Sequence, residues 1–343
     1  MATLNYTKRL SNLQDRKFDR ELNESLISKT FSASQLPDNV KYLVESMRPI
    51  DQKYNSKTID AASRVQKHLQ DGYDLHFNRA YRTQGSVRTA TNIKVHSDFD
   101  LLTIIDRYHF NAPEIPNEID YTETSPDDDI LELRTQSTKI LKEIYDEVDD
   151  KGEKSISVFN KSLNRKVDIV FCFWYHEQKY IETKDEYYRG VYLYKFPIKT
   201  KERDFPFAHL GQVNSKGDNT SDGSRRGIRL LKTLRADCDT ELKVVKSFHL
   251  TTIVHSIANL NLQYLPGNEI TIAKAMSDEI KKLIDEPTYR KEVKSPNGME
   301  TPLAKDETVP EIKRLKEDLD TLIEDSAKEI LSSQVIKKAI ITY

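Results

Sequence analysis

Three aspartates have the types and placement needed for metal-assisted phosphoryl or nucleotidyl transfer. Asp98 and Asp100 open an apolar run, DFDLLTII, and Asp168 lies inside a second one, KVDIVF. Alternate residues of a strand point to one face, so Asp98 and Asp100 would project together while Phe99 enters the core. Two divalent cations about 3.5–4 Å apart can stabilise an attacking hydroxyl and a leaving pyrophosphate, and Mg²⁺ prefers carboxylate ligands. The trio predicts a site for two Mg²⁺ ions, with Mn²⁺ able to replace them, in which Asp168 also helps to deprotonate the attacking hydroxyl.

A Gly-Ser turn lies upstream of these carboxylates. Gln84, Gly85 and Ser86 end the extended aromatic segment YDLHFNRAYRTQGS. Glycine lets backbone N–H groups come close to phosphate oxygens, and a serine hydroxyl can add a further donor. We expect these three residues to bind the nucleotide.

The Asp-x-Asp spacing alone is not specific in a chain with 55 acidic residues. The pair at Asp98 and Asp100 stands out because it begins an apolar strand, where an unpaired charge is costly. Elsewhere the spacing is interpreted as solvated charge on loops or helix surfaces, and it occurs at Asp127/Asp129, Asp237/Asp239 and Asp318/Asp320.

Strands and helices must position these residues. Apolar and β-branched runs predict strands at 98–105, 155–159 and 166–175. Helical periodicity or composition predicts helices at 58–71 (capped by Thr58 or Asp60), 134–148, 225–236 and 243–260. Polar segments with proline or glycine predict loops at 106–130 and 201–224. The pattern is α+β: a strand-rich lobe at 40–200, a helical lobe at 201–343, and N-terminal helices within 1–39 that pack across both.

Composition limits the location and the partners. The net charge of −2 gives no overall attraction for nucleic acid. No apolar run approaches the roughly 18 residues of a membrane span, and the N-terminus lacks a signal-peptide core. The two cysteines, Cys172 and Cys238, form no CxxC pair, and Cys172 is expected to be a buried thiol. We expect a cytoplasmic protein that is a monomer and does not bind membranes.

The segment QGSVRTATNIKVHSDFDLL resembles the signature of DNA polymerase beta-like nucleotidyltransferases. Twelve residues separate Gly85 from Asp98, a spacing similar to that of cyclic GMP-AMP synthase and its bacterial relatives, the DncV-like and CdnE-like enzymes of the CD-NTase family. The resemblance covers about residues 60–260. It implies that 40–200 is a nucleotidyltransferase catalytic lobe with a mixed sheet, and that the helical lobe forms the other side of an active-site cleft.

Further matches lie downstream. RRGIRLLK resembles the family helix whose lysine holds the triphosphate, which would be Lys232. KSFHLTTIVH resembles the segment in which a serine contacts phosphate and an aromatic ring stacks on a base, which would be Ser247 and Phe248. The eight histidines and two cysteines offer no cluster like the zinc thumb of the animal DNA sensor. The terminal sequence ITY lacks the small last residue of relatives that are conjugated through their tails.

The resemblance implies an enzyme that joins nucleoside triphosphates, ATP and/or GTP, into a cyclic di- or trinucleotide for antiphage (CBASS-type) signalling through a separate effector protein. We expect no requirement for DNA or RNA: the arginines near Lys232, with Arg225 and Arg229 on its helical face, are expected to meet nucleotide phosphates. Two alternatives stay open. One is a transferase acting on a tRNA 3′ end or a protein. The other is an inactive nucleotide-binding regulator, which would not need three clustered like charges.

Overall fold

The computed structural model describes residues 4–18, 36–97, 99–116 and 124–332. The chain forms two compact units. The first, called here the sheet unit, consists of Asp51–Thr89 and His96–Gly211; the second, the helical unit, consists of Met1–Ile50, Ala90–Val95 and Gln212–Tyr343. The chain therefore passes from one unit to the other four times, and neither unit is a continuous stretch of sequence.

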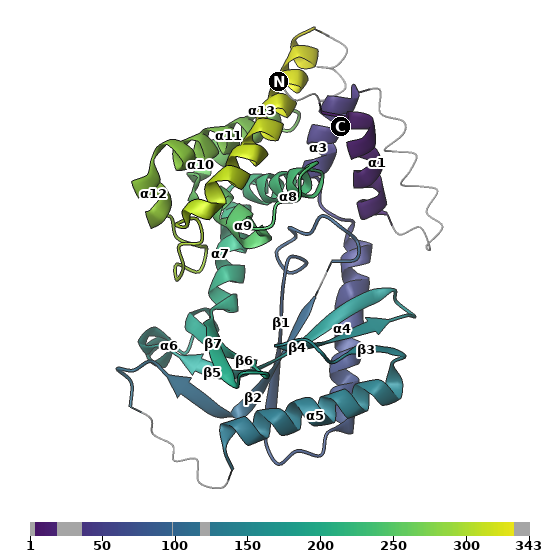
Figure 1. Ribbon diagram of the computed structural model, residues 1–343, viewed down its shortest axis with the longest axis vertical. Coiled ribbons are helices and arrows are strands. Elements are labelled where there is room, and N and C mark those ends of the chain that lie inside the picture. The colour runs from purple at the N-terminus through teal and green to yellow at the C-terminus, as the bar shows by residue number, and fades with distance from the viewer. Residues whose placement is uncertain (1–3, 19–35, 98, 117–123, 333–343) are drawn as a thin grey trace. The chain divides into compact units, whose positions relative to one another are not determined.

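Seven strands within the described residues form one mixed sheet (Figure 1). The order is β1-β2-β5-β4-β3, and β6 pairs with β5 and with β7. β2 and β5 are parallel, whereas the other pairs are antiparallel. The strands are β1 (Arg79–Gln84), β2 (Asp100–Asn111), β3 (Glu147–Asp149), β4 (Ser155–Asn160), β5 (Arg165–His176), β6 (Arg189–Lys195) and β7 (Thr200–Asp204).

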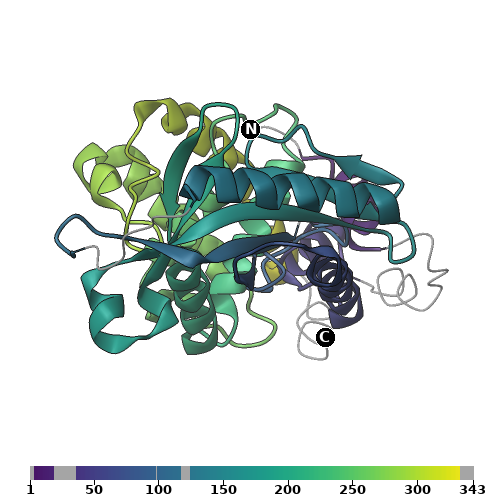
Figure 2. The ribbon, with the colours of Figure 1, turned by 90° about the horizontal axis from the view of Figure 1, so that it is seen from below.

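Two long helices, α4 (Gln52–Gly72) and α5 (Pro126–Ile144), cover one face of the sheet (Figure 2). Odd-numbered side chains of β2 and β5, such as Leu101 and Ile169, pack against them, and so does Phe99. Even-numbered side chains, such as Leu102 and Cys172, form a smaller core on the opposite face. Because successive side chains of a strand point to opposite faces, the even-numbered Asp100 and Asp168 lie on the face away from α4 and α5.

The remaining elements of the sheet unit are short, except for α7. They are α6 (Gln178–Thr183), the 3₁₀ turn η2 (Glu186–Tyr188) and the first part of α7 (Pro206–Asn219), which continues into the helical unit. Cys172 is a fully buried thiol whose pKa is raised by burial.

The helical unit is built around one apolar core contributed by α1, α3, α8, α9, α11 and α13. Within the described ranges no helix is long and apolar enough to cross a membrane. The helices of the helical unit are α1 (Tyr6–Lys17), α3 (Asp38–Met47), α8 (Gly223–Ala236), α9 (Ser247–Ser256), α10 (Asn259–Leu262), α11 (Ile270–Asp285), α12 (Pro287–Glu292), the 3₁₀ turn η3 (Asp306–Thr308) and α13 (Val309–Ser332).

The loop expected at 106–130 is wrong at both ends and holds for 112–116 and 124–125, while 117–123 lie outside the described residues; the loop expected at 201–224 is wrong in large part. β2 continues to Asn111 and α5 begins at Pro126, while β7 and α7 occupy most of the second segment. The start of α5 carries standard signals: the Ser125 hydroxyl accepts from the Asp128 backbone N–H at 3.1 Å, and Pro126 occupies the first turn. In α7 a Cβ on Gly211 would lie 2.9 Å from the Tyr187 ring, so this glycine serves close packing rather than a turn.

Other predicted boundaries also shift. The helix predicted at 58–71 is α4, which begins six residues earlier and is capped by Asp51 rather than by Thr58 or Asp60. The helix predicted at 134–148 is α5, which ends at Ile144, and the one predicted at 243–260 is confined to α9. The strand β6 was not predicted. The strands expected near 98–105, 155–159 and 166–175 and the helix at 225–236 are confirmed as β2, β4, β5 and α8.

Candidate active site

Asp100 and Asp168 are direct neighbours in the sheet. They are paired in register on the parallel strands β2 and β5, and the Asp168 N–H donates to the Phe99 carbonyl at 3.0 Å. Adjacent strands lie about 4.8 Å apart, so two side chains in register on one face stand side by side. Like charges placed in this way repel each other. The arrangement brings together the two predicted carboxylates that the structure describes.

Polar neighbours orient both carboxylates. Gln84 is in register with Asp100 on β1, and its side-chain amide donates to Asp100 Oδ2 at 3.2 Å. On β4, Ser157 is in register with Asp168, and its hydroxyl donates to Asp168 Oδ1 in a short hydrogen bond. The Lys166 ammonium lies 3.1 Å from the Asp168 carboxylate. Sequence reasoning missed Ser157 and Lys166. The i, i+2 spacing could have indicated Lys166, whereas Ser157 requires the strand register.

The turn after β1 has the conformation expected for a glycine. Gly85 has φ 107°, a left-handed value that other residues rarely adopt. The Arg88 N–H donates to the Gly85 carbonyl at 3.1 Å, and the Thr89 hydroxyl donates to the Ser86 carbonyl at 3.2 Å. This tight turn directly follows the strand that carries Gln84.

Asp98, the third predicted carboxylate, lies outside the described residues. Among the described residues no group of three or more histidine, cysteine, aspartate or glutamate side chains could hold a metal ion. Asp100 and Asp168 nevertheless supply the oxygen ligands that a hard divalent cation prefers. Such a cation would also offset the repulsion between two carboxylates in register, so the donor set fits the predicted metal.

Lys232 lies in the helical unit, on α8. Its ammonium donates to the Thr91 carbonyl at 3.1 Å and to the Thr91 hydroxyl at 3.3 Å. Thr91 belongs to Ala90–Val95, called here the 90–95 strap, which the helical unit includes although both flanking segments belong to the sheet unit. Burial, followed by the nearby Arg229 guanidinium, lowers the pKa of Lys232 to about 8. The amine is therefore close to its titration range at neutral pH.

Arg229 links three segments of the helical unit through hydrogen bonds. Its guanidinium is fully buried and makes three hydrogen bonds of 2.6 Å, each to a different segment. The acceptors are the Met47 carbonyl at the end of α3, the Ala90 carbonyl in the 90–95 strap and the Asp222 carboxylate at the start of α8. The expectation that Arg229 meets nucleotide phosphates is wrong, because the guanidinium is fully buried and each of its three nitrogens already donates to an acceptor within the protein.

The other arginines of α8 also have partners within the protein. Arg225 donates to the Asn214 carbonyl at 2.9 Å and lies 2.8 Å from Asp218. Arg235 donates to the carbonyls of Val245 and Leu242. The expectation that Arg225 faces phosphates is therefore not supported either. The basic cluster seen in the sequence holds neighbouring segments of the protein in place, α7 among them.

Ser247 and Phe248 form the first turn of α9. Ser247 is exposed and Phe248 is half-buried, so the phenyl ring is not enclosed in the core. The turn is fixed by the Lys246 N–H, which donates to His249 Nδ1 at 3.1 Å. An exposed hydroxyl and a partly exposed ring are compatible with the binding roles implied by the resemblance.

The other Asp-x-Asp pairs are not simply solvated, which corrects their interpretation. One aspartate of each pair is buried: Asp129, Asp237 and Asp318. Each has a specific neutral or cationic donor: Tyr108 for Asp129 at 2.6 Å, Arg16 for Asp237 at 2.7 Å, and Arg9 for Asp318. Burial of one carboxylate therefore does not distinguish a catalytic pair in this protein.

The chain is similar to known cyclic dinucleotide synthases along most of its length. The chain is 30% identical over 298 residues to the cyclic dinucleotide synthase CdnE of Yersinia aleksiciae, a match that covers 85% of this chain and 77% of that protein. It is 29% identical over 326 residues to a c-di-GMP synthase of Capnocytophaga granulosa, covering 88% of this chain and 91% of that protein. The solved structure of a STING-associated CdnE c-di-GMP synthase from Capnocytophaga granulosa has a TM-score of 0.80 at 27% identity, covering 95% of this chain and 99% of that one. No protein-family model matches the chain.

The structural likeness confirms the predicted fold, an α+β arrangement of the DNA polymerase beta-like type with a mixed sheet. Dependence on divalent metal is general among nucleotidyltransferases of this kind. The identity and coverage also confirm the resemblance inferred from the Gly-Ser and Asp-x-Asp motifs. The chain belongs to the CdnE family of cyclic dinucleotide synthases, nucleotidyltransferases that join nucleoside triphosphates into a cyclic product.

Proposed function

We propose that this enzyme joins two GTP molecules into c-di-GMP. The observation that carries the proposal is the in-register pair Asp100 and Asp168 beside the Gly85 turn, in a chain similar to a c-di-GMP synthase over 88% of its length. The signal would act through a separate effector protein in antiphage defence, since the Capnocytophaga granulosa relative is described as STING-associated. The enzyme would work as a monomer in the cytoplasm, where its nucleotide substrates are found.

The roles of the site residues form part of this proposal. Asp98, Asp100 and Asp168 would hold two Mg²⁺ ions, or Mn²⁺, which supply charge stabilisation for the leaving pyrophosphate. Asp168, oriented by Ser157 and Lys166, would accept the proton of the attacking hydroxyl. The sheet unit would be the catalytic lobe and the helical unit the second lobe. The bounds expected from the sequence, 40–200 and 201–343 with 1–39 packing across both, differ from these units, because α1, α3 and the 90–95 strap belong to the helical unit and 201–211 to the sheet unit.

The nucleotide itself would be held by the remaining predicted residues. Gln84, Gly85 and Ser86 would present backbone and side-chain donors to phosphate oxygens. Lys232 and Ser247 would bind the triphosphate, and Phe248 would stack on a base, which requires only a π face.

The decisive experiment supplies nuclease-treated protein with radiolabelled GTP, ATP, CTP and UTP, singly and together, with Mg²⁺ or Mn²⁺. We expect GTP alone to give a phosphatase-resistant product with the mass of c-di-GMP. A mixed product would contradict the base assignment. Label transferred to added tRNA or protein, or no product at all, would support a macromolecular acceptor or an inactive regulator instead. Product formed only after duplex is restored, with a steep salt dependence, would show that nucleic acid is required.

The depressed pKa of Lys232 predicts a pH-dependent affinity for triphosphate. An anion binds the protonated amine, so binding should be strongest below pH 8 and weaken by up to about tenfold per unit as the pH rises above 8. The measurement is the dissociation constant of a non-hydrolysable triphosphate from pH 7 to 9.5. Lys232→Met should bind weakly at every pH with a flat profile. If that variant keeps the slope of the unmodified enzyme, another group is responsible.

Stacking by Phe248 makes a separate prediction. Phe248→Tyr keeps an aromatic face and should retain most activity, whereas Phe248→Leu should raise the KM for nucleotide about tenfold, within the range of 1–3 kcal/mol measured for base stacking. Steady-state kinetics check this. Equal KM values in the two variants would leave Phe248 with a packing role only.

A further inference from the structure

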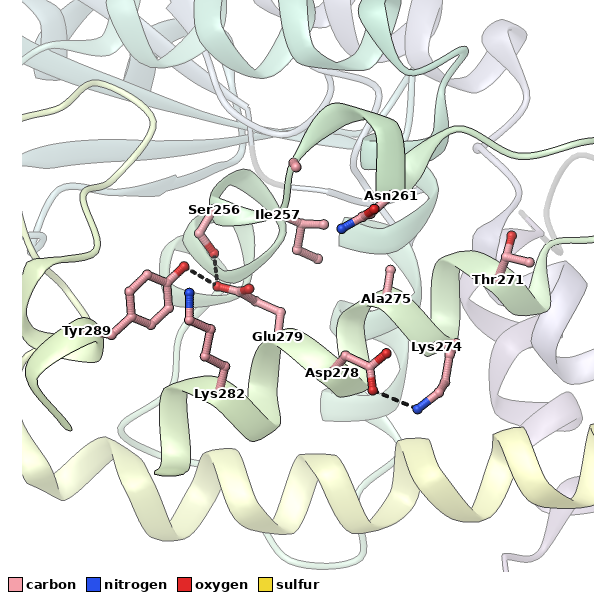
Figure 3. A pocket seen from close by; sticks show the side chains of 11 residues that line it. Ser256, Ile257, Asn261, Thr271, Lys274, Ala275, Asp278, Glu279, Lys282 and Tyr289 are labelled. Atoms are coloured by element: carbon pink, nitrogen blue, oxygen red, sulfur yellow. Dashed lines mark hydrogen bonds and ion pairs between the residues drawn. The ribbon is translucent and has the colours of Figure 1, made fainter. Parts of the chain in front are cut away.

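A groove on the helical unit is lined by none of the residues assigned above (Figure 3). Its volume is about 600 Å³, within the range of roughly 300–1,000 Å³ that is usual for small-molecule sites. One wall is the outward stripe of α11 from Thr271 to Lys282, and the other is the connection between α9 and α10 around Ile257. Tyr289 of α12 closes one end.

Glu279 is a fixed hydrogen-bond acceptor at this end. Its Oε1 accepts from the Ser256 hydroxyl at 2.6 Å and from the Tyr289 hydroxyl at 2.8 Å (Figure 3). Burial raises the pKa of Tyr289 to about 12, so the phenol keeps its proton and remains a donor. Within the described part of the chain, the hydrogen bonds of Glu279 are made by Oε1, and the Lys216 ammonium adds an electrostatic interaction with the carboxylate. A carboxylate accepts only, so a ligand that meets Glu279 has to bring N–H or O–H groups.

Two lysines lie along the same wall. The Lys282 ammonium is 3.5 Å from the centroid of the Tyr289 ring, so this tyrosine positions a cation on its ring and a carboxylate at its hydroxyl. Lys274 lies eight residues away, about 12 Å along the helix, and is bound to Asp278 at 2.6 Å. The groove therefore offers an oriented acceptor with one lysine on each side of it, and Asp278, which also lines the groove, is the partner that a phosphate would displace from Lys274.

Small side chains leave space between these charged groups. Ile257 is buried and provides apolar surface, while Ala258 and Ala275 do not project beyond Cβ. Asn261 faces α11 across the groove (Figure 3). A flat ring can lie on such a surface, with its polar edge toward Glu279.

We propose that this groove is a second nucleotide site, which binds a guanine nucleotide with its base at Glu279 and its phosphate at Lys274 or Lys282. Guanine carries two adjacent donors, N1–H and the N2 amino group, on one edge. One of them can donate to Oε2 while the other also faces the negative charge, since Oε1 already accepts two hydrogen bonds. Adenine presents one donor and one acceptor on that edge, and its acceptor would face the negative charge. Lysine binds phosphate as a point charge. The site differs from the one that performs the reaction, and it does not depend on which bases the enzyme joins.

The test is photolabelling of the full-length protein with 8-azido-GMP in EDTA, followed by peptide mapping. We expect label within residues 256–289 and better competition by GMP than by AMP. E279Q should reduce that labelling at least about tenfold, since a hydrogen bond to a charged group is worth roughly 1.5–3 kcal/mol. Asp285→Asn, an exposed acid on the same helix paired with Lys281, should label as the unmodified protein does.

Three results would overturn the proposal: label found only in other peptides, equal competition by AMP, or unchanged labelling of E279Q. Mapping and competition use the unmodified protein, so they remain decisive even if E279Q folds poorly. Because the readout is the labelled position rather than a product, it is unaffected if the enzyme proves to join bases other than guanine.

Discussion

Asp100→Asn should reduce product formation by about 10³-fold while leaving the protein folded. Metal-assisted stabilisation is worth several kcal/mol, and each 1.4 kcal/mol changes a rate tenfold. Asparagine has nearly the same shape and keeps an oxygen that can accept from Gln84, so the sheet should not change. Removing one of two like charges in register should preserve or slightly increase stability. Initial rates of product formation and a thermal unfolding curve measure the two effects.

Asp106→Asn is the matched control. Asp106 lies on the same strand, is exposed, and accepts from the Trp174 indole N–H at 2.7 Å, a bond that an amide oxygen can also accept. This variant should retain nearly full activity. Equal loss in both variants would indicate that any charge change on β2 disturbs the enzyme, and the metal-binding role of Asp100 would be abandoned.

Arg229→Met should be the most destabilising substitution tested. It removes three hydrogen bonds from a fully buried guanidinium, and the Met47 and Ala90 carbonyls lose that donor. Removing one partner from a buried charged network costs about 3–5 kcal/mol, so Tm should fall by roughly 10 °C. Arg229→Lys can restore only some of these hydrogen bonds, so its Tm should lie between those of the unmodified protein and Arg229→Met.

Arg64→Met provides the comparison for that measurement. Arg64 is exposed on α4 and makes one hydrogen bond, to Ser162 at 3.2 Å. Surface substitutions of this type usually change stability by less than about 0.5 kcal/mol. A similar Tm for the Arg229 and Arg64 variants would contradict the inference that the hydrogen bonds of Arg229 stabilise the helical unit.

Motifs with a strong local signal were readable from the sequence. Asp100 and Asp168 sit in apolar strands, and the Gly85 turn requires a left-handed residue, so residue type and period were sufficient. The neighbours of these residues were not readable. Ser157 reaches Asp168 through strand register, which depends on pairing between segments far apart in sequence. The partners of Arg229 lie 182 and 139 residues away.

Local composition was misleading where tertiary packing decides the structure. The segment that became α7 contains two glycines and many polar residues, which favoured a loop. Its Gly211 instead lets the helix approach Tyr187, a requirement that no local pattern displays. The stretch that opens α5 was also interpreted from its proline and aspartates alone, although Ser125, Pro126 and the acidic first turn together form a helix start.

Because the chain crosses between its two units four times, the segments of the helical unit are synthesised at separate times during translation. All segments of the sheet unit have been synthesised once the ribosome has passed Gly211. The helices α1 and α3 are made first, yet α3 packs against α8 and α13, and α8 begins about 175 residues after α3 ends. At about 5–20 residues per second, the apolar face of α3 waits roughly 10–35 s for α8, and longer for α13. These helices are thus buried only after the sheet unit and α8 have been made, and their apolar faces are exposed to aggregation during that interval of translation.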